Sequence, residues 1–503
     1  MAAASHSGPC ATANLLSRSE FRRRSRVGPS IPIRRHAMTY KQLIDGELVT
    51  GAKSLSVINP ATGKVFESCA QADEAQMNRA VAAAKRAFPA WSRLSHEARR
   101  DALDSLANAM EARASEFARL LTMEQGKPLP QAEHEIQGAI GAIRTFAAMD
   151  TPMQMLRDVP GTRIYEQRTP LGVVAAITPW NFPMLLMMAK VAPALITGNT
   201  VIAKPAPSTP LTTSLFGEVA AAILPPGVLN VVVDANDLGG LLSRHPDIAK
   251  VSFTGATATG KKVMESVAGT LKRLTLELGG NDAAILLDDA DVSVFAPKIF
   301  QAAMLNAGQV CFAAKRVYAP SSRYDEICEA LAQLARDAVV GDGLEAGTEI
   351  GPIQNQPQYE KVRGYLQDAH ARGTVIAGGH ALEREGYFIA PTIVRDIPSD
   401  AKLVREEQFG PVLPVLAYDH IEEAIAQVND SPYGLGGTIW TGDPQRAVRV
   451  AMRIESGMVW INKHLDLPFD MPFGGAKSSG LGSEYGREGM EEYTQRKLIN
   501  LAP

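Results

Sequence analysis

The sequence contains few cysteines and no long apolar run. Its 503 residues include four cysteines, none closely spaced, so the pattern predicts neither a disulfide framework nor a structural zinc site. The main apolar stretch, Pro183 to Thr197, is interrupted by Lys190 and is shorter than the roughly 20 residues that cross a bilayer. A reducing compartment and no membrane span are therefore predicted. The cysteines are Cys10, Cys69, Cys311 and Cys328.

The main part of the chain also lacks repeats, low-complexity segments and a strong net charge. The formal charge is −3, and because residues 1–37 contribute +6 of it, residues 38–503 carry −9. A mildly acidic body gives no reason to expect a nucleic-acid partner.

Residues 1–37 have an unusual composition, with seven arginines, six serines and one acidic residue. This composition is typical of a mitochondrial transit peptide, although a clean amphipathic period is missing. Alternatively the segment precedes the true start, because Met38 opens a stretch, MTYKQLIDGELVTG, that is typical of the beginning of a folded domain. The first interpretation predicts the mitochondrial matrix and the second the cytoplasm.

From Leu171 onwards, short β-branched runs alternate with helix-length segments. Strands are predicted at VVAAI (173–177), TVIAK (200–204), LNVVV (229–233) and KVSFT (250–254). Helices are predicted over 184–195, 211–222, 238–242 and 257–267. This spacing is typical of βαβ units with a parallel sheet, in the doubly wound arrangement that binds nucleotides.

The flanking segments also fit an α/β fold class. Residues 73–122 have helical spacing and predict two or three helices. Residues 153–171, with a Pro-Gly turn at 160–161, predict a β-hairpin that stands off the main sheet. A second α/β region is predicted from about 283 to 462, with strands near Val317, Val375, Val412 and Met458. Because single cores stop growing near roughly 250–300 residues, two or three domains are expected.

A strand, a glycine-containing loop and a helix start follow one another over 250–267. Such a helix N-terminus points backbone N–H groups at an anion. The segment GATATGKK is one residue from a G-x-x-x-x-G-K-[ST] phosphate loop, but Lys262 stands where that loop needs a hydroxyl for Mg²⁺. A dinucleotide pyrophosphate is the favoured interpretation. A P-loop-like nucleotide-binding protein is the remote alternative. An ordinary tight turn that binds no ligand is the purely structural interpretation.

Two more residues are candidates on local grounds. Cys311, in NAGQVCFAAKR, follows small residues that allow close backbone approach, and a thiolate is a strong nucleophile. A lone cysteine is equally a common core residue. Glu277 ends an apolar run before two glycines, where desolvation raises the pKa of a carboxylate toward the range of a general base. It could also cap a turn, so local sequence leaves both roles open.

These candidates belong to an ordered series of motifs: TPWNFP (178–183), AKPA around Lys204, FTGATATG (253–260), LELGG (276–280), GQVC (308–311), EEQFGPV (406–412) and MPFGGAKSSGLG (471–482). With them the sequence resembles the NAD(P)-dependent aldehyde dehydrogenase superfamily over about residues 40–500. The resemblance implies an α/β fold with a doubly wound cofactor-binding domain, an α/β catalytic domain and a small β oligomerisation arm.

The resemblance implies a mechanism residue by residue. Cys311 attacks the aldehyde to form a thiohemiacetal, Asn181 and the Cys311 amide hold the oxyanion, and Glu277 activates the water that hydrolyses the thioester. Glu484 matches a carboxylate assigned to proton relay in some members. A CoA-acylating relative would not need Glu277 and a crystallin-like structural relative could lose Cys311, so both residues favour a hydrolysing enzyme.

The resemblance also implies which residues contact the cofactor, and it implies no metal site. The implied contacts are Trp180, Lys204, Gly255, Gly260, Glu407 and Phe409. Many NAD-preferring members have a glutamate three residues after the lysine, which grips the ribose hydroxyls and repels a 2′-phosphate, whereas this chain has Pro207. NAD is the expected cofactor, with NADP tolerated.

The implied aldehyde pocket is apolar, and consists of Phe182, Leu186, Ala189, Val310, Phe312, Leu465, Leu467 and Phe473. Succinate-semialdehyde members usually have an arginine at the position of Ala189, so an uncharged aliphatic or aromatic aldehyde is expected. Semialdehydes, held by Lys463 or His464, and aminoaldehydes, held by Asp466 or Asp470, are the alternatives.

The resemblance divides the chain into an NAD(P)-binding domain (38–153 and 174–276), a catalytic domain (277–486) and an oligomerisation arm (154–173 and 487–503). The arm hairpin and the predicted strand KLINLA (497–502) present an edge that one subunit cannot cover. A homodimer or homotetramer is therefore expected.

Overall fold

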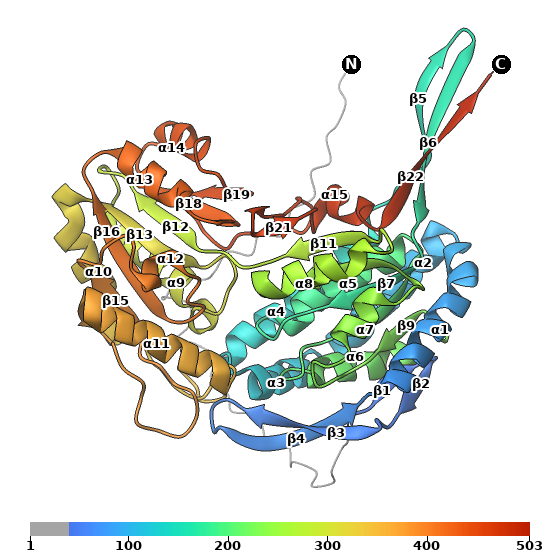
Figure 1. The fold of residues 1–503 in the computed structure, drawn as a ribbon, viewed down its shortest axis with the longest axis horizontal. Coiled ribbons are helices and arrows are strands. Elements are labelled where there is room, and N and C mark those ends of the chain that lie inside the picture. Colours follow the sequence, from blue (N-terminus) through green and yellow to red (C-terminus); the bar gives the residue numbers. More distant parts are fainter. Residues whose placement is uncertain (1–39, 503) are drawn as a thin grey trace. The chain divides into compact units, whose positions relative to one another are not determined.

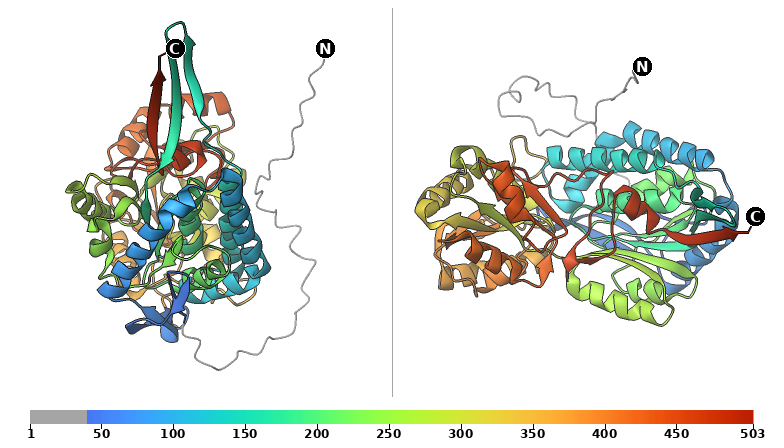
Figure 2. Two further views of the ribbon diagram at one scale, coloured as in Figure 1. Left: turned by 90° about the vertical axis from the view of Figure 1, so that its right-hand side faces the viewer. Right: turned by 90° about the horizontal axis from the view of Figure 1, so that it is seen from above.

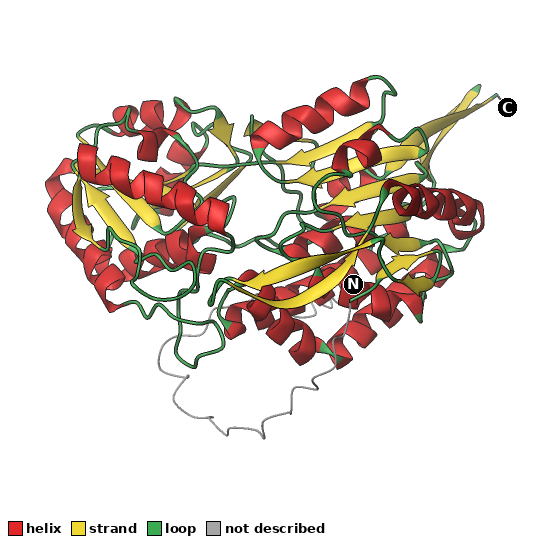
Figure 3. Cartoon of the chain, turned by 60° about the horizontal axis from the view of Figure 1, so that its bottom comes forward, coloured by secondary structure: helices red, strands yellow, loops and turns green. Residues whose placement is uncertain are grey.

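The computed structural model describes residues 40–502, so the predicted targeting segment at 1–37 lies outside the described part. Helices and strands alternate along most of the described chain (Figures 1 and 3), which confirms the α/β class. Among residues 40–502, no helix is both long enough and apolar enough to cross a membrane.

An eight-stranded sheet has the order β2-β1-β9-β8-β7-β10-β11-β21. Its five central strands are parallel: β9 (Leu229–Val231), β8 (Thr200–Lys204), β7 (Val173–Ile177), β10 (Ile248–Thr254) and β11 (Arg273–Glu277). The outer strands β1 (Gln42–Ile44), β2 (Glu47–Val49) and β21 (Gly480–Leu481) pair antiparallel. The predicted doubly wound sheet is confirmed, although β9 ends two residues before the predicted 233.

Helices cover both faces of this sheet because its strands are apolar on both sides. In β7, Val174 and Ala176 face one core and Val173, Ala175 and Ile177 face the other. The first core is covered by α2 (His96–Ala112), α3 (Ala114–Gln125), α4 (Leu129–Ala147), α5 (Pro183–Ile196) and α6 (Leu211–Ala221). The second is covered by α1 (Glu74–Ser92), α7 (Gly239–Arg244) and α8 (Thr257–Ala268).

Local sequence signals place several of these helix ends. Asp73 begins α1 with a capping box that includes Gln76. Pro183 occupies the first turn of α5, where its missing N–H costs nothing. The helices predicted over 73–122 are confirmed as α1 to α3, whereas the buried α4 was not predicted.

A seven-stranded sheet forms the second core, in the order β14-β15-β16-β13-β12-β18-β19. The strands are β14 (Thr374–Ala377), β15 (Thr392–Arg395), β16 (Val412–Tyr418), β13 (Ala314–Pro320), β12 (Asp282–Leu286), β18 (Gly436–Trp440) and β19 (Met458–Ile461), all parallel except β14. The covering helices include α9 (Val292–Met304), α10 (Tyr324–Asp337), α11 (Gln356–Arg372), α13 (Ile421–Asn429) and α14 (Pro444–Ala451). The second α/β region predicted over 283–462 is confirmed.

A three-stranded antiparallel ribbon projects from the body (Figures 1 and 2). It consists of β5 (Gln154–Val159), β6 (Thr162–Pro170) and β22 (Thr494–Leu501), with the predicted turn at 160–161. A separate hairpin pairs β3 (Lys53–Asn59) with β4 (Lys64–Gln71). Further short elements are α12 (Lys402–Arg405), β17 (Tyr433–Gly434), β20 (Ala476–Lys477) and α15 (Gly486–Glu491).

Candidate active site

Polar side chains gather where the parallel strands of the eight-stranded sheet end. Lys204 ends β8, Glu277 ends β11, and Thr178 directly follows β7. The Thr178 hydroxyl and Glu277 Oε1 are buried without a hydrogen-bond partner among the described residues. Ligands of doubly wound sheets bind at this carboxyl edge, so these atoms face the place where a nucleotide is expected.

The start of α8 lies at the same edge. Its first residue follows Gly255 and Ala256, and no side chain caps it, so the N–H groups of its first turn are available to an anion. The Gly255 N–H donates to the Glu277 carbonyl at 3.0 Å. Gly260 has a packing role, because a Cβ there would lie 2.4 Å from the Leu278 side chain.

Cys311 lies in a loop with a constrained backbone. The preceding short helix (Leu305–Gly308) contains Asn306 and Ala307 with φ of 52° and 55°, in the left-handed region. Gly308 has φ +72°, and a Cβ there would lie 2.3 Å from the Gly410 carbonyl oxygen. This loop is therefore built around a glycine that no larger residue can replace without moving the backbone.

The turn after Glu277 packs directly on this loop. A Cβ on Gly280 would lie 2.4 Å from the Cys311 carbonyl oxygen, so the second glycine of LELGG permits the approach. Burial raises the pKa of the Cys311 thiol, the Glu277 charge raises it further, and the Lys315 ammonium opposes both. The structure thus brings the predicted nucleophile and the predicted base together.

Asn181 is held against the same loop. It is 3% exposed, and its side-chain Nδ2 donates to the Gln309 carbonyl at 3.0 Å. Its own carbonyl accepts from Lys127 Nζ at 2.9 Å and from Asn306 Nδ2 at 3.0 Å. Among residues 40–502 one amide hydrogen is used for orientation and the second has no partner, as an oxyanion donor requires.

Lys127 belongs to a buried pair that sequence reasoning missed. Its ammonium lies 2.5 Å from the Glu135 carboxylate and 3.7 Å from the centre of the Phe182 ring. Glu135 in turn accepts from the Met184 N–H at 2.9 Å, at the start of α5. The pair therefore orients the turn that carries Asn181.

A second buried lysine lies beneath Cys311. Lys315 is 2% exposed, and its ammonium donates to the Val310 carbonyl at 2.5 Å. That carbonyl belongs to the peptide whose N–H is the Cys311 amide, so the bond polarises this N–H toward a developing oxyanion. Burial lowers the pKa of Lys315, while Glu407 and Asp282 raise it.

Glu277 has two charged neighbours that form their own ion pair. Lys190 and Glu484 are in direct contact, and Lys190 also donates to the Thr254 hydroxyl at 2.7 Å. Burial raises the pKa of Glu277 well above its usual value, Glu484 raises it further, and Lys190 opposes the shift. Glu277 is therefore a stronger base than an exposed glutamate.

Glu407, Phe409 and Trp180 make two further contacts near the Cys311 loop. Glu407 Oε1 accepts from the Gly280 N–H at 3.0 Å, which joins it to the Glu277 turn. Burial raises the pKa of Glu407. The Phe409 and Trp180 rings are 5.3 Å apart in an edge-to-face arrangement. These three predicted cofactor residues flank the Cys311 loop, whereas Lys204 lies at the end of β8.

The predicted pocket residues divide into aromatic contacts and core positions. Phe312 packs against Phe473 and Trp460, with ring centres 5.4 and 5.9 Å apart. His464 stacks on Trp460 at 4.8 Å, and its Nε2 lies 2.7 Å from the Phe312 carbonyl oxygen. Ala189 and Val310 are buried, Leu186 is half-buried, and Leu465 and Leu467 pack at the margins of two different cores.

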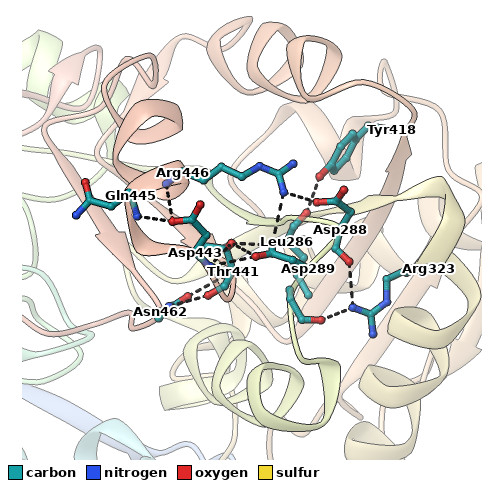
Figure 4. Close-up of polar contacts among 11 residues, drawn as sticks. Leu286, Asp288, Asp289, Arg323, Tyr418, Thr441, Asp443, Gln445, Arg446 and Asn462 are labelled. Carbon is teal, nitrogen blue, oxygen red and sulfur yellow. Dashed lines mark hydrogen bonds and ion pairs between the residues drawn. The ribbon is translucent and has the colours of Figure 1, made fainter.

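The loop after β19 is held by a polar network at the ends of the seven-stranded sheet (Figure 4). Asn462 Nδ2 donates to the Thr441 carbonyl and Asn462 Oδ1 accepts from the Thr441 N–H, both at 2.9 Å. The Thr441 hydroxyl donates to Asp289 at 2.7 Å. This network fixes the start of the loop that carries His464.

Sequence reasoning missed Lys127, Lys315 and Asp234, which pairs with Lys204 at 2.6 Å. For Asp234 the available signal was an aspartate directly after the apolar run VVV (231–233), whereas Lys127 and Lys315 lie near other polar residues and had no such signal. Lys190 does interrupt an apolar stretch, so its signal was visible in the sequence.

Comparisons with known proteins show which family this chain resembles. The model of the aldehyde dehydrogenase family matches residues 49–499. The chain is 38% identical over 484 residues to phenylacetaldehyde dehydrogenase of Pseudomonas fluorescens, covering 92% of this chain and 96% of the relative. It is 38% identical over 467 residues to the NADP⁺ succinate-semialdehyde dehydrogenase of Escherichia coli, covering 91% and 96%. Betaine aldehyde dehydrogenase of Staphylococcus aureus, solved with NAD⁺, superposes with a TM-score of 0.90 at 34% identity, covering 92% and 95%.

Proposed function

The chain belongs to the aldehyde dehydrogenase family and oxidises an aldehyde to the carboxylic acid with NAD(P)⁺, and we propose that Cys311, Glu277 and Asn181 carry the reaction. The observation that supports this most directly is the contact between the Cys311 loop and the turn after Glu277. This contact supports the pairing of a proposed nucleophile with a proposed base, whose pKa is raised by burial.

In the proposed mechanism the Cys311 thiol loses its proton to water, and the resulting thiolate, favoured by the Lys315 ammonium, adds to the aldehyde carbon and forms a thiohemiacetal. The oxyanion accepts from the Cys311 amide and from the free amide hydrogen of Asn181. Lys315 strengthens the first donor through the Val310 carbonyl. After oxidation to the thioester, Glu277 removes a proton from water, which attacks the acyl carbon and releases the acid.

The carboxyl edge of the eight-stranded sheet fits NAD(P)⁺. The uncapped start of α8 suits the pyrophosphate, and the unpartnered Thr178 hydroxyl can serve as a further contact. Lys204 would hold the adenosine ribose, and Glu407, Phe409 and Trp180 the nicotinamide end. When bound, the cofactor supplies the two-electron acceptor. NAD⁺ is the proposed preference.

The substrate is proposed to be an uncharged aliphatic or aromatic aldehyde. Phe312, which directly follows Cys311 in the sequence, packs against Phe473 and Trp460, so the three rings form one aromatic surface. Burial lowers the pKa of His464 to about 4, so its ring is neutral at physiological pH. Lys463 and Asp466 pair with each other, which leaves neither as a free partner for a charged substrate. These contacts weigh against the semialdehyde alternative and against Asp466 as the partner of an aminoaldehyde.

Reduction of NAD⁺ and NADP⁺, followed at saturating cofactor with an aldehyde panel, tests this proposal. The panel contains aliphatic, aromatic, ω-carboxylated and amino aldehydes, each with and without CoA. We expect the highest kcat/KM with uncharged aldehydes and no dependence on CoA. A preference for the charged aldehydes would refute the substrate proposal. In Cys311→Ser, turnover should be abolished while cofactor binding is retained, and substantial residual activity would refute the nucleophile.

The three sheets support a proposed division into the cofactor, catalytic and arm domains set out above. One strand departs from those boundaries. β21 lies within 277–486, the proposed catalytic domain, but pairs with β11 in the eight-stranded sheet. The ribbon exposes apolar side chains, including Met155 (55%), Leu498 (56%) and Leu501 (48%). We propose that a second subunit covers this ribbon in a homodimer or homotetramer. A monomeric mass in light scattering at micromolar concentration would contradict it.

For localisation we propose the cytoplasm, with the mitochondrial matrix as the alternative raised by residues 1–37. Cys69, Cys311 and Cys328 are free thiols, as a reducing compartment allows. Incubation of the full chain, and of a chain beginning at Met38, with isolated mitochondria tests the alternative. Protease-protected uptake of the full chain alone would favour import.

A further inference from the structure

Lys204 has a carboxylate partner that comes from a different strand. Asp234 lies three residues after β9, the neighbour of β8, and its Oδ1 is 2.6 Å from Lys204 Nζ. The two side chains are 0% and 3% exposed, respectively. The pair therefore lies inside the carboxyl edge of the sheet, where Lys204 is proposed to meet the adenosine ribose.

Asp234 is held in this position by its second oxygen. Oδ2 accepts from the Leu238 N–H at 2.8 Å, just before α7. Oδ1 has the ion pair with Lys204 but no directional hydrogen bond among the described residues. Gly239, at the start of α7, lies close to the lysine, because a Cβ there would be 3.7 Å from Lys204 Cε. The aspartate is thus fixed with its Oδ1 against the Lys204 ammonium.

This arrangement has a direct electrostatic consequence for the ribose. The hydroxyls of NAD⁺ can share the lysine and a carboxylate, as doubly wound dinucleotide sites commonly do. The 2′-phosphate of NADP⁺ needs an unpaired cation and is repelled by a nearby carboxylate. Because Asp234 neutralises Lys204, the subsite offers little net positive charge to a phosphate.

We propose that Asp234, acting through Lys204, makes this enzyme discriminate against NADP⁺. Pro207 stands where a discriminating glutamate would follow Lys204 by three residues, and Asp234 supplies the missing charge from the loop after the adjacent strand β9. The inference rests on the proposed cofactor site and assigns its ribose specificity to one residue.

Direct binding in the absence of aldehyde tests the proposal. Calorimetric titration with NAD⁺ and with NADP⁺ gives the Kd ratio for the wild type and for Asp234→Asn, which keeps the size of the side chain and an acceptor for Leu238. We expect Kd(NADP⁺)/Kd(NAD⁺) to fall by about tenfold to a hundredfold, the effect of removing one nearby charge. The kcat/KM ratio of the two cofactors should move in the same direction.

Asp237→Asn is the matched control, because it makes the same charge change at an exposed position in the same loop. Its Kd ratio should change less than twofold. The double variant Asp234→Asn with Lys204→Met should lose the gain in NADP⁺ affinity, since the freed cation is absent. Thermal unfolding of each variant verifies that it is folded.

Failure of this inference is distinguishable from failure of the proposed function. An unchanged Kd ratio in folded Asp234→Asn, with aldehyde oxidation intact, overturns the role of Asp234 alone. An equal change in Asp237→Asn also overturns it, because the effect would then come from overall loop charge. Absence of dinucleotide binding and aldehyde oxidation in the wild type would overturn the proposed function itself.

Discussion

Replacement of Glu277 by glutamine separates the two halves of the proposed reaction. Glu277 is 5% exposed and its Oε1 has no hydrogen-bond partner among the described residues. The amide has nearly the same size, so the change removes the base without breaking a hydrogen bond at this oxygen. Acylation of Cys311 should therefore proceed while hydrolysis of the thioester slows.

The expected loss follows from general-base catalysis. Removal of a positioned base typically costs about 10²–10⁴ in rate, or about 2.7–5.4 kcal/mol of transition-state stabilisation. Burial and Glu484 raise the pKa of Glu277, which strengthens it as a base and places its titration above that of an exposed glutamate. The wild-type kcat should rise with pH as Glu277 ionises, and the variant should lack this rise.

Whereas kcat should rise with pH, the folding stability of the wild type should fall. Because the folded pKa lies above the unfolded one, the native state binds more protons between them, and wild-type stability falls as pH rises through this range. Glutamine does not titrate. The variant should therefore unfold at the same or a higher temperature than the wild type above pH 7, which excludes misfolding as the cause of lost turnover.

Stopped-flow measurement of cofactor reduction provides the assay. We expect a burst of up to one reduced cofactor per active subunit, followed by slow turnover, because deacylation becomes rate-limiting. If the burst disappears together with turnover, Glu277 is required to activate Cys311 and its assignment is wrong. Unchanged turnover would show that the carboxylate is only structural.

Three further predictions follow from the buried groups and the ribbon. Lys315→Met should lower kcat about tenfold and shift the alkylation of Cys311 by iodoacetamide to higher pH. The reason is that the variant loses the cation that favours both the thiolate and the oxyanion. Stopped-flow and alkylation rates that match the wild type would refute this prediction. Burial lowers the pKa of His464 to about 4. The stabilising contribution of the neutral imidazole should therefore be lost as pH falls from about 6.5 to 4, which lowers the free energy of unfolding by up to about 3 kcal/mol. Urea unfolding of His464→Gln should lack this pH-dependent loss. Leu498→Asp, at an exposed position of β22, should halve or quarter the mass in light scattering, and an unchanged mass would contradict the arm interface.

The sequence alone predicted the doubly wound sheet because its strands are short apolar runs at βαβ spacing. VVAAI and TVIAK became β7 and β8 without a change of boundary. The 160–161 turn was equally predictable, since Pro-Gly restricts the backbone locally. The ordered motifs around Cys311, Glu277 and Asn181 were visible as well, because each combines a reactive side chain with adjacent small or rigid residues. Signals of this kind lie within a few neighbouring residues.

Contacts between distant segments had no such signal. Local patterns do not reveal that Lys204 meets Asp234, or that Lys127, 54 residues before Asn181, donates to its carbonyl. Buried lysines are expensive unless paired, and which carboxylate or carbonyl pairs with each is decided only when sheets and helices pack. Residue types and their order therefore determined the fold class and the chemistry. The tertiary structure alone decided which charges neutralise one another, because electrostatic pairing depends on distance in space and not on separation along the chain.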